Sequence, residues 1–167
     1  MKIKKTVLLF TLLPFRLVFG AEPCLIKAIP GVALGPIRIG STAEEVKASV
    51  KVTRESSTGK DQYMEAGVYR ISLRDNRVRE VWVEDIRAMP ECISIGGKKV
   101  NTKIKVAAIP SLYGPCERED LIGGSFYHCK GSTLHFGFGM GTSLQLLISD
   151  KFWRVETRMD SELGNIR

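Results

Sequence analysis

The sequence predicts an α+β fold of two tandem helix–β–β–β units, in which one antiparallel sheet carries the helices packed on one of its faces. Two helix-start patterns lie sixty residues apart, at 41–48 and 101–108. Each is followed by alternating polar and apolar residues that are typical of a β-hairpin, at 67–85 and 131–150. We therefore expect a signal peptide at 1–20, a first unit at 21–90, a second unit at 91–150, and a C-terminal segment at 151–167 that packs on the sheet or is exposed.

The first residues have the pattern of an export signal. Lys2, Lys4 and Lys5 precede an apolar run at 6–15, and a signal peptidase would accept a cut after Gly20. The run is too short to cross a bilayer, which takes about 20 apolar residues. A buried N-terminal helix is the alternative interpretation. The pattern favours a periplasmic or secreted protein without stable membrane insertion.

The net charge argues against a nucleic-acid partner. The whole chain carries +7, but four basic residues lie before residue 21, which leaves 21 basic and 18 acidic residues and a charge of +3. The chain has no dense basic run with interleaved aromatic residues. The balance gives only a weak preference for an acidic partner.

The cysteines predict two disulfides, because an even number of cysteines in an oxidising compartment is usually paired. All four lie after the predicted leader, at Cys24, Cys92, Cys116 and Cys129. Of the three pairings, we favour Cys116–Cys129, the pair closest in sequence, together with Cys24–Cys92. A metal site that includes a histidine is the alternative, but no C-x-x-C spacing is present. We expect neither a metal nor a cofactor.

Residues 41–48 begin a helix by their capping pattern. Ser41 or Thr42 can accept hydrogen bonds from the first free N–H groups, and a glutamate three residues later can reach back to the cap. Residues 101–108 repeat the Thr, Val and Ala of this pattern but lack the glutamate, so their cap is weaker.

The first hairpin is expected to turn through a three-residue loop at 75–77, which places Ile71 opposite Val81. A two-residue loop would place Glu80 opposite Ile71 and bury its carboxylate without a partner. The inner face, toward the helices, then holds Tyr69, Ile71, Leu73, Val81 and Val83, and in the second hairpin Leu134, Phe136, Phe138, Met140, Leu144, Leu146 and Ile148. The outer face holds Arg70, Ser72, Arg74, Val78, Glu80, Trp82 and Glu84, and in the second hairpin Thr133, His135, Gly137, Gln145 and Leu147.

The outer face is the predicted partner-binding surface. Trp and Arg side chains are common at the centres of protein interfaces, because they combine a large contact area with a polar edge. The candidate binding residues are Trp82, Arg70, Glu80, Glu84 and His135. The alternative is that residues 151–167 cover Trp82.

No set of catalytic residues is recognisable. His128 stands beside a cysteine that is predicted to be disulfide-bonded, and neither histidine has a Ser or Cys nucleophile in a recognisable turn. Glu117, Glu119 and Asp120 follow Cys116 and are interpreted as a solvated acidic loop, with a carboxylate site as the alternative. We therefore expect a protein that is not an enzyme.

Residues 35–42 (GPIRIGST), followed by Glu44-Glu45-Val46, resemble the opening of small envelope domains of the SmpA/OmlA type. Leu112-Tyr113-Gly114-Pro115 is similar to the helix end of such domains. Two such units in tandem, exported and disulfide-bonded, are similar in layout to the β-lactamase inhibitory protein family. The resemblance implies a helix layer under a curved sheet whose open face clasps a protein partner, with Trp82, Arg70 and His135 on that face.

These observations predict an inhibitor or immunity protein that binds a cell-envelope enzyme, such as a peptidoglycan hydrolase-type toxin or a β-lactamase. The alternative is a non-inhibitory structural or assembly module of the bacterial envelope. A homodimer through the outer face is left open, and a small-ligand binder that uses the cleft between the units is a third hypothesis.

Overall fold

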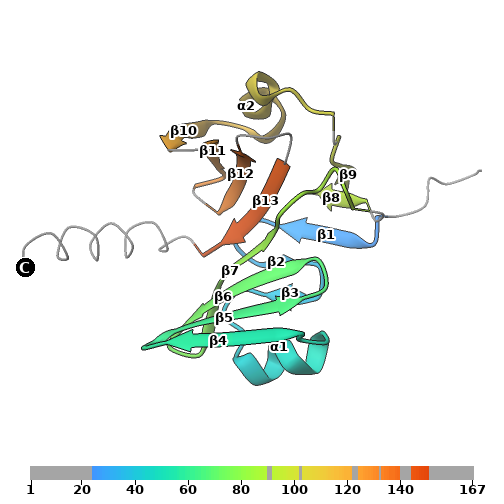
Figure 1. The fold of residues 1–167 in the computed structure, drawn as a ribbon. Helices are drawn as coiled ribbons and strands as arrows, with labels where there is room; N and C mark the ends of the chain where they lie inside the picture. The colour runs from blue at the N-terminus through green and yellow to red at the C-terminus, as the bar shows by residue number, and fades with distance from the viewer. Residues whose placement is uncertain are drawn as a thin grey trace, which may run out of the picture.

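The computed structural model of the chain describes residues 24–89, 92–101, 103–121, 124–131, 133–139 and 144–150. In this part of the chain, two β-sheets form most of the structure and only two short α-helices are present, α1 (Ala43–Ser49) and α2 (Ile109–Tyr113) (Figure 1). The predicted α+β class, with helices packed on one face of a sheet, is therefore wrong. A second sheet takes the place that the helices were expected to fill.

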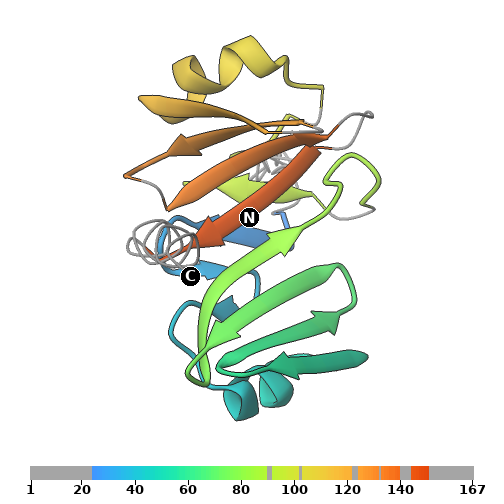
Figure 2. The same ribbon diagram turned by 60° about the vertical axis from the view of Figure 1, so that its left-hand side comes forward.

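The large sheet has eight antiparallel strands in the order β10-β11-β12-β13-β7-β6-β5-β4. Each half of the chain contributes four of them, and β13 joins β7 to make the sheet continuous. Figure 2 shows the series from β10 at the top to β4 at the bottom. The strands are β4 (Arg54–Thr58), β5 (Asp61–Ala66), β6 (Tyr69–Arg74), β7 (Arg77–Val83), β10 (Cys116–Leu121), β11 (Gly124–Cys129), β12 (Leu134–Gly139) and β13 (Leu144–Ser149).

The small sheet has five short strands in the order β3-β2-β1-β8-β9. Its centre is a parallel pair, β1 with β8, that brings together segments from the two halves of the chain. The sequence patterns did not predict these strands, because runs of two to four residues are too short to show an alternation. They are β1 (Ile26–Ile29), β2 (Ala33–Leu34), β3 (Ile37–Arg38), β8 (Ile93–Ile95) and β9 (Lys98–Lys99).

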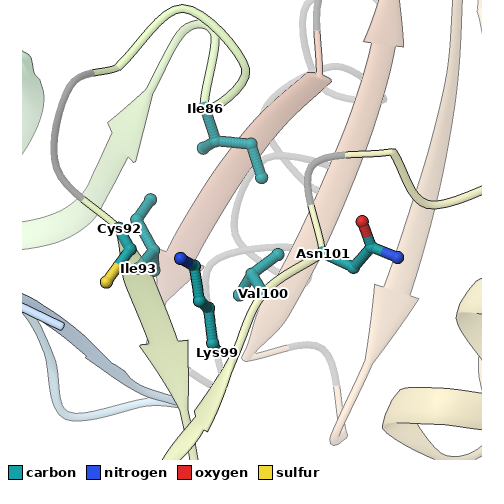
Figure 3. A pocket seen from close by; sticks show the side chains of 6 residues that line it. All are labelled: Ile86, Cys92, Ile93, Lys99, Val100 and Asn101. Carbon is teal, nitrogen blue, oxygen red and sulfur yellow. The ribbon is translucent and has the colours of Figure 1, made fainter. Parts of the chain in front are cut away.

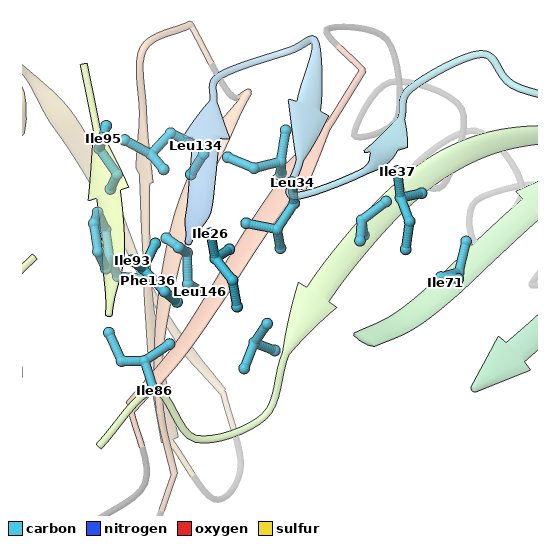
Figure 4. Close-up of a cluster of buried hydrophobic side chains, with 14 of the residues drawn as sticks. Ile26, Leu34, Ile37, Ile71, Ile86, Ile93, Ile95, Leu134, Phe136 and Leu146 are labelled. Atoms are coloured by element: carbon cyan, nitrogen blue, oxygen red, sulfur yellow. The ribbon is translucent and has the colours of Figure 1, made fainter. Parts of the chain in front are cut away.

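The hydrophobic core lies between the two sheets. Side chains of the small sheet, such as Ile26 and Leu34, meet side chains of β12 and β13, such as Phe136 and Leu146 (Figure 4). All of them are almost completely buried. The inner-face residues predicted for the hairpins belong to this core, except Met140, which lies outside the described residues. The small sheet thus covers part of the inner face of the large one, and the two short helices add Val46 and Ile109 to the same core.

Helix α1 begins as its sequence predicts. Thr42 accepts a hydrogen bond from the backbone N–H of Glu45, and the Glu45 carboxylate accepts one from the backbone N–H of Thr42 at 2.8 Å. This reciprocal pair is the expected capping box. The turn between β6 and β7 adds a third contact, because the Asn76 Oδ1 accepts a hydrogen bond from the Ala43 N–H at 3.1 Å.

The second helix begins later than predicted. The Asn101 side chain accepts a hydrogen bond from the Lys103 N–H at 2.9 Å and forms a turn rather than a helix cap. A short 3₁₀ segment, η1 (Val106–Ala108), leads into α2, which starts beside Pro110 and has no side-chain cap. The helix ends at Gly114, within the Leu-Tyr-Gly-Pro stretch that was expected to end it.

The hairpin between β6 and β7 turns through two residues, and the predicted three-residue loop is wrong. Asp75 and Asn76 both adopt positive φ angles, 51° and 57°, and the flanking Arg74 and Arg77 form the last pair of the ladder. Asn and Asp tolerate this left-handed conformation better than other non-glycine residues, which explains the tight turn.

A β-bulge restores the predicted register beyond this turn. The register shifts between Ser72 and Leu73, so that Ile71 pairs with Val81 as expected. The shift also turns Val78 into the core, where it is completely buried, although its position in the alternation predicts it on the outer face. The bulge, rather than a longer loop, keeps Glu80 off the inner face.

Both favoured disulfides are present. Cys24–Cys92 ties the chain just before β1 to the chain just before β8, and Cys116–Cys129 joins directly opposite residues of β10 and β11. Strand β10 contains the acidic residues that were predicted to form a loop, so that prediction is wrong. Among the described residues, no helix is long and apolar enough to cross a membrane.

Asn76 offers a test of the contact between the β6–β7 turn and α1. Replacing Asn76 with Ala removes both the hydrogen bond to Ala43 and a side chain that tolerates positive φ, so we expect a loss of about 2 kcal/mol in the free energy of unfolding. Asn76→Asp keeps an acceptor oxygen but replaces the amide that hydrogen-bonds the Glu44 carboxylate, so in a Glu44→Gln background it should lose less than about 1 kcal/mol. Urea unfolding measures both, and equal losses would contradict the contact.

Candidate functional site

The outer face of the large sheet, opposite the small sheet, is the candidate functional site. Trp82 stands near its centre on β7, half-buried, with Arg70 directly opposite on β6 and Leu147 directly opposite on β13. The ring of Tyr63, from β5, lies beside the indole at a centroid distance of 5.8 Å and an interplanar angle of 47°. Trp82, Tyr63 and Arg70 are called the Trp82 cluster below.

Arg70 is fixed within this cluster. Its Nε lies 3.3 Å from the Glu84 carboxylate, and a second nitrogen lies 4.0 Å from the Glu65 carboxylate. It also donates to the backbone carbonyls of Gly67 and Tyr69, at 3.2 and 3.3 Å. Two carboxylates and two backbone carbonyls surround the guanidinium, which limits the conformations in which a partner would meet it.

Tyr63 keeps its hydroxyl proton. Burial, followed by the charge of Glu65, raises the pKa of the Tyr63 hydroxyl. The phenol is therefore a hydrogen-bond donor at neutral pH, and it adds a polar tip to the aromatic surface of the cluster.

The five predicted partner-binding residues do not form one surface. Trp82, Arg70 and Glu84 lie together and reach solvent, with the Glu84 side chain 59% exposed. Glu80 and His135 also belong to the outer face by their register, but they are only 7% and 1% exposed. In this structure these two side chains are not accessible to a partner.

Glu80 is a buried carboxyl group with little compensation. Its Oε1 is buried without a hydrogen-bond partner. Burial, followed by the negative charge of Asp150, raises the Glu80 pKa from 4.5 to about 7. The neighbouring Arg79 does not neutralise it, because its guanidinium binds Asp150 instead. Glu80 is therefore partly protonated at neutral pH.

A row of hydrogen-bonded side chains crosses four adjacent strands, β10 to β13. The Glu119 carboxylate lies 2.9 Å from Nε2 of His128, the two histidines meet through their Nδ1 atoms at 2.6 Å, and Nε2 of His135 lies 2.7 Å from the Ser149 hydroxyl. His128 is 6%, His135 1% and Ser149 0% exposed. These four residues are called the histidine row below.

The histidine row was missed from the sequence, although one signal for it exists. His128 and His135 stand at symmetric positions in the hairpin of β11 and β12, which places them directly opposite each other. Glu119 could not be placed, because its segment was predicted to be a loop. The Ser149–His135 contact is that of a nucleophile and its base, but the Ser149 hydroxyl is fully buried and no substrate reaches it in this structure.

A separate, concave site lies beside the Cys24–Cys92 disulfide. Ile86, Ile93 and Val100 line a cleft of about 320 Å³ together with Cys92, Lys99 and Asn101 (Figure 3). Its polar groups do not converge on one point, so its lining designates no ligand. Within the described ranges, no three His, Cys, Asp or Glu side chains gather as metal ligands.

No protein-family model matches the chain, and no match to it was found among curated proteins or solved structures. The resemblance to SmpA/OmlA-type domains and to the β-lactamase inhibitory protein family therefore stays a prediction.

Replacing Glu80 with Gln tests the buried carboxyl group. The folded protein binds the Glu80 proton more tightly than the unfolded chain, so Glu80 lowers stability as the pH rises from 4.5 to about 7. We expect Glu80→Gln to raise the free energy of unfolding more at pH 8 than at pH 5, by about 2 to 3 kcal/mol. Urea unfolding at both pH values measures it. Glu84→Gln, at an exposed position, is the control, and the same pH dependence in both variants would contradict the assignment.

Proposed function

We propose that this chain is an exported, disulfide-bonded protein that binds another protein through the Trp82 cluster and acts as an inhibitor or immunity protein against a cell-envelope enzyme. The observation that carries the proposal is the cluster itself: two packed aromatic rings and an arginine held by two carboxylates, on a half-exposed face of a continuous sheet.

Export is supported by the cysteines and by the N-terminal pattern. All four cysteines are paired in two disulfides, and such bonds persist in oxidising compartments. The leader pattern at 1–20 fits the same compartment.

Protein binding is supported by the composition and rigidity of the cluster. Trp, Tyr and Arg account for a large share of interface hot spots, because they bury much area and carry a polar group. Arg70 is already ordered by Glu84 and Glu65, and Trp82 by Tyr63. A surface that is ordered before binding loses less side-chain entropy on association. This favours a tight complex, as an inhibitor needs.

Site-specific photo-crosslinking tests the surface in intact cells. A photoreactive amino acid at Ser72, opposite Tyr63 of the cluster, should give one covalent adduct with an envelope protein. The same amino acid at Arg38, exposed on β3 of the small sheet, should give none. An envelope enzyme in the adduct, whose activity the purified protein lowers, supports inhibition. An envelope-assembly protein favours the structural module, and no adduct at Ser72 contradicts the binding surface.

With the captured partner, single substitutions test the hot spot. We expect Trp82→Ala to raise the dissociation constant by roughly 30-fold, which corresponds to a loss of about 2 kcal/mol in binding free energy. Arg54→Ala is the control outside the cluster, because Arg54 pairs with Glu65 as Arg70 does but its side chain is 73% exposed on edge strand β4. Its effect should stay below about threefold. Equal effects of the two substitutions, measured by calorimetry, would contradict the proposal.

A further inference from the structure

The three contacts within the histidine row can all be hydrogen bonds when both imidazoles are neutral. His128 donates from Nε2 to Glu119, which leaves its Nδ1 as an acceptor. His135 then donates from Nδ1, and its Nε2 accepts from the Ser149 hydroxyl. The two Nδ1 atoms, 2.6 Å apart, need a hydrogen between them, because two lone pairs at that distance would repel.

One added proton fits into the row without any heavy atom moving. An imidazolium at His128 donates from both ring nitrogens, to Glu119 and to Nδ1 of His135. His135 then carries its own hydrogen on Nε2 and donates it to the Ser149 oxygen. The added positive charge lies next to the Glu119 carboxylate, which stabilises it.

A second added proton does not fit. Both Nδ1 atoms would then carry a hydrogen while they face each other at 2.6 Å. Two positive rings, with centroids 4.9 Å apart, would also be buried together. The Nδ1–Nδ1 contact between β11 and β12 must therefore break when the second proton binds.

A shared proton explains this contact better than a shared metal ion. Two nitrogens that bind one tetrahedral Zn²⁺ at about 2.0–2.1 Å lie roughly 3.3 Å apart. The observed 2.6 Å is much shorter. The described residues also supply no third ligand to the pair.

Among the described residues, the charged groups around the pair come from the strands on either side. Strand β10 supplies Glu119 and also Glu117, which lies opposite His128. On the other side, β13 places the apolar Leu147 opposite His135, and β7 places Glu80 opposite Ser149. The Glu80 pKa of about 7 means that this carboxylate loses its charge as the medium becomes acidic.

We propose that the histidine row is a pH-sensitive latch: its side chains stay linked across β10 to β13 while the pair carries at most one added proton, and the Nδ1–Nδ1 contact breaks when the second proton binds. The break should shift Trp82, because Leu147 lies directly opposite both His135 and Trp82 in the register. An exported protein meets the pH of its surroundings, so the Trp82 cluster would change with that pH. The latch itself does not depend on a partner.

NMR of the imidazole nitrogens in the intact protein, from about pH 8 to pH 4, tests the proton count. At pH 8 we expect hydrogen on Nδ1 of His135 and on Nε2 of His128. Acidification should add one proton to the pair, and a separate later step should shift β11, β12 and the Trp82 indole together. Two independent titrations without a change at Trp82 would contradict the latch. Stoichiometric Zn²⁺ binding at pH 8, with loss of the Nδ1 hydrogen, would contradict the shared proton.

Glu119→Gln tests what stabilises the first proton. Removing this carboxylate should lower the midpoint of the first proton uptake by about one pH unit or more, because the imidazolium loses its counter-charge. Asp120→Asn, on the same strand but on its other face with a 64% exposed side chain, is the control and should lower it by less than about 0.3 units. Equal shifts in the two variants would overturn the assignment of Glu119.

The pH dependence of unfolding tests the latch independently. The unfolded chain binds a proton at each histidine, whereas the folded row holds one, so acid favours unfolding. In a Glu80→Gln background, which removes the opposing titration of Glu80, the unfolding constant should rise up to tenfold per pH unit between about pH 6 and pH 5. A constant that does not change over this range would overturn the proposal. None of these measurements needs the binding partner, so their outcome is independent of the proposed inhibition.

Discussion

The antiparallel pairing of β13 with β7 is the interaction on which the rest of the structure depends. Four directly opposite pairs, from Leu146–Val83 to Ser149–Glu80, join the strands of the first half of the chain to those of the second. The join removes two exposed sheet edges, which would otherwise offer unpaired backbone groups to other chains. It also creates one inner face, which the small sheet covers, and one outer face, across which side chains line up in rows.

The outer face carries two arrangements that the join places side by side. The Trp82 cluster lies on the β5–β7 side, where an arginine between two carboxylates is ordered next to two aromatic rings. The histidine row lies on the β10–β13 side, where both imidazoles and Ser149 are buried and short hydrogen bonds link the side chains. Leu147 separates them, opposite Trp82 in one direction and opposite His135 in the other. A rigid contact surface and a titratable network are therefore neighbours.

The features that local chemistry determines could be predicted from the sequence. The capping box of Thr42 and Glu45 needs only residues three apart, and the alternation in the hairpins shows which side chains enter the core. The small sheet could not be predicted, because its parallel pairing of β1 with β8 joins segments 67 residues apart and neither strand exceeds four residues. The tight turn at Asp75-Asn76 and its bulge were missed, because together they give the same Ile71–Val81 pair as the predicted three-residue loop. Glu119 was missed as a site residue because it lies on β10, whose charged residues are typical of a loop.

Native-state hydrogen exchange is the measurement that tests the joined sheet most directly. Amides of β7 and β13 should exchange with one common opening free energy, equal to that of global unfolding, because neither half keeps its core without the other. Exchange in two groups, with one opening free energy for strands β4–β7 and a different one for β10–β13, would contradict the continuous sheet and the shared outer face built on it.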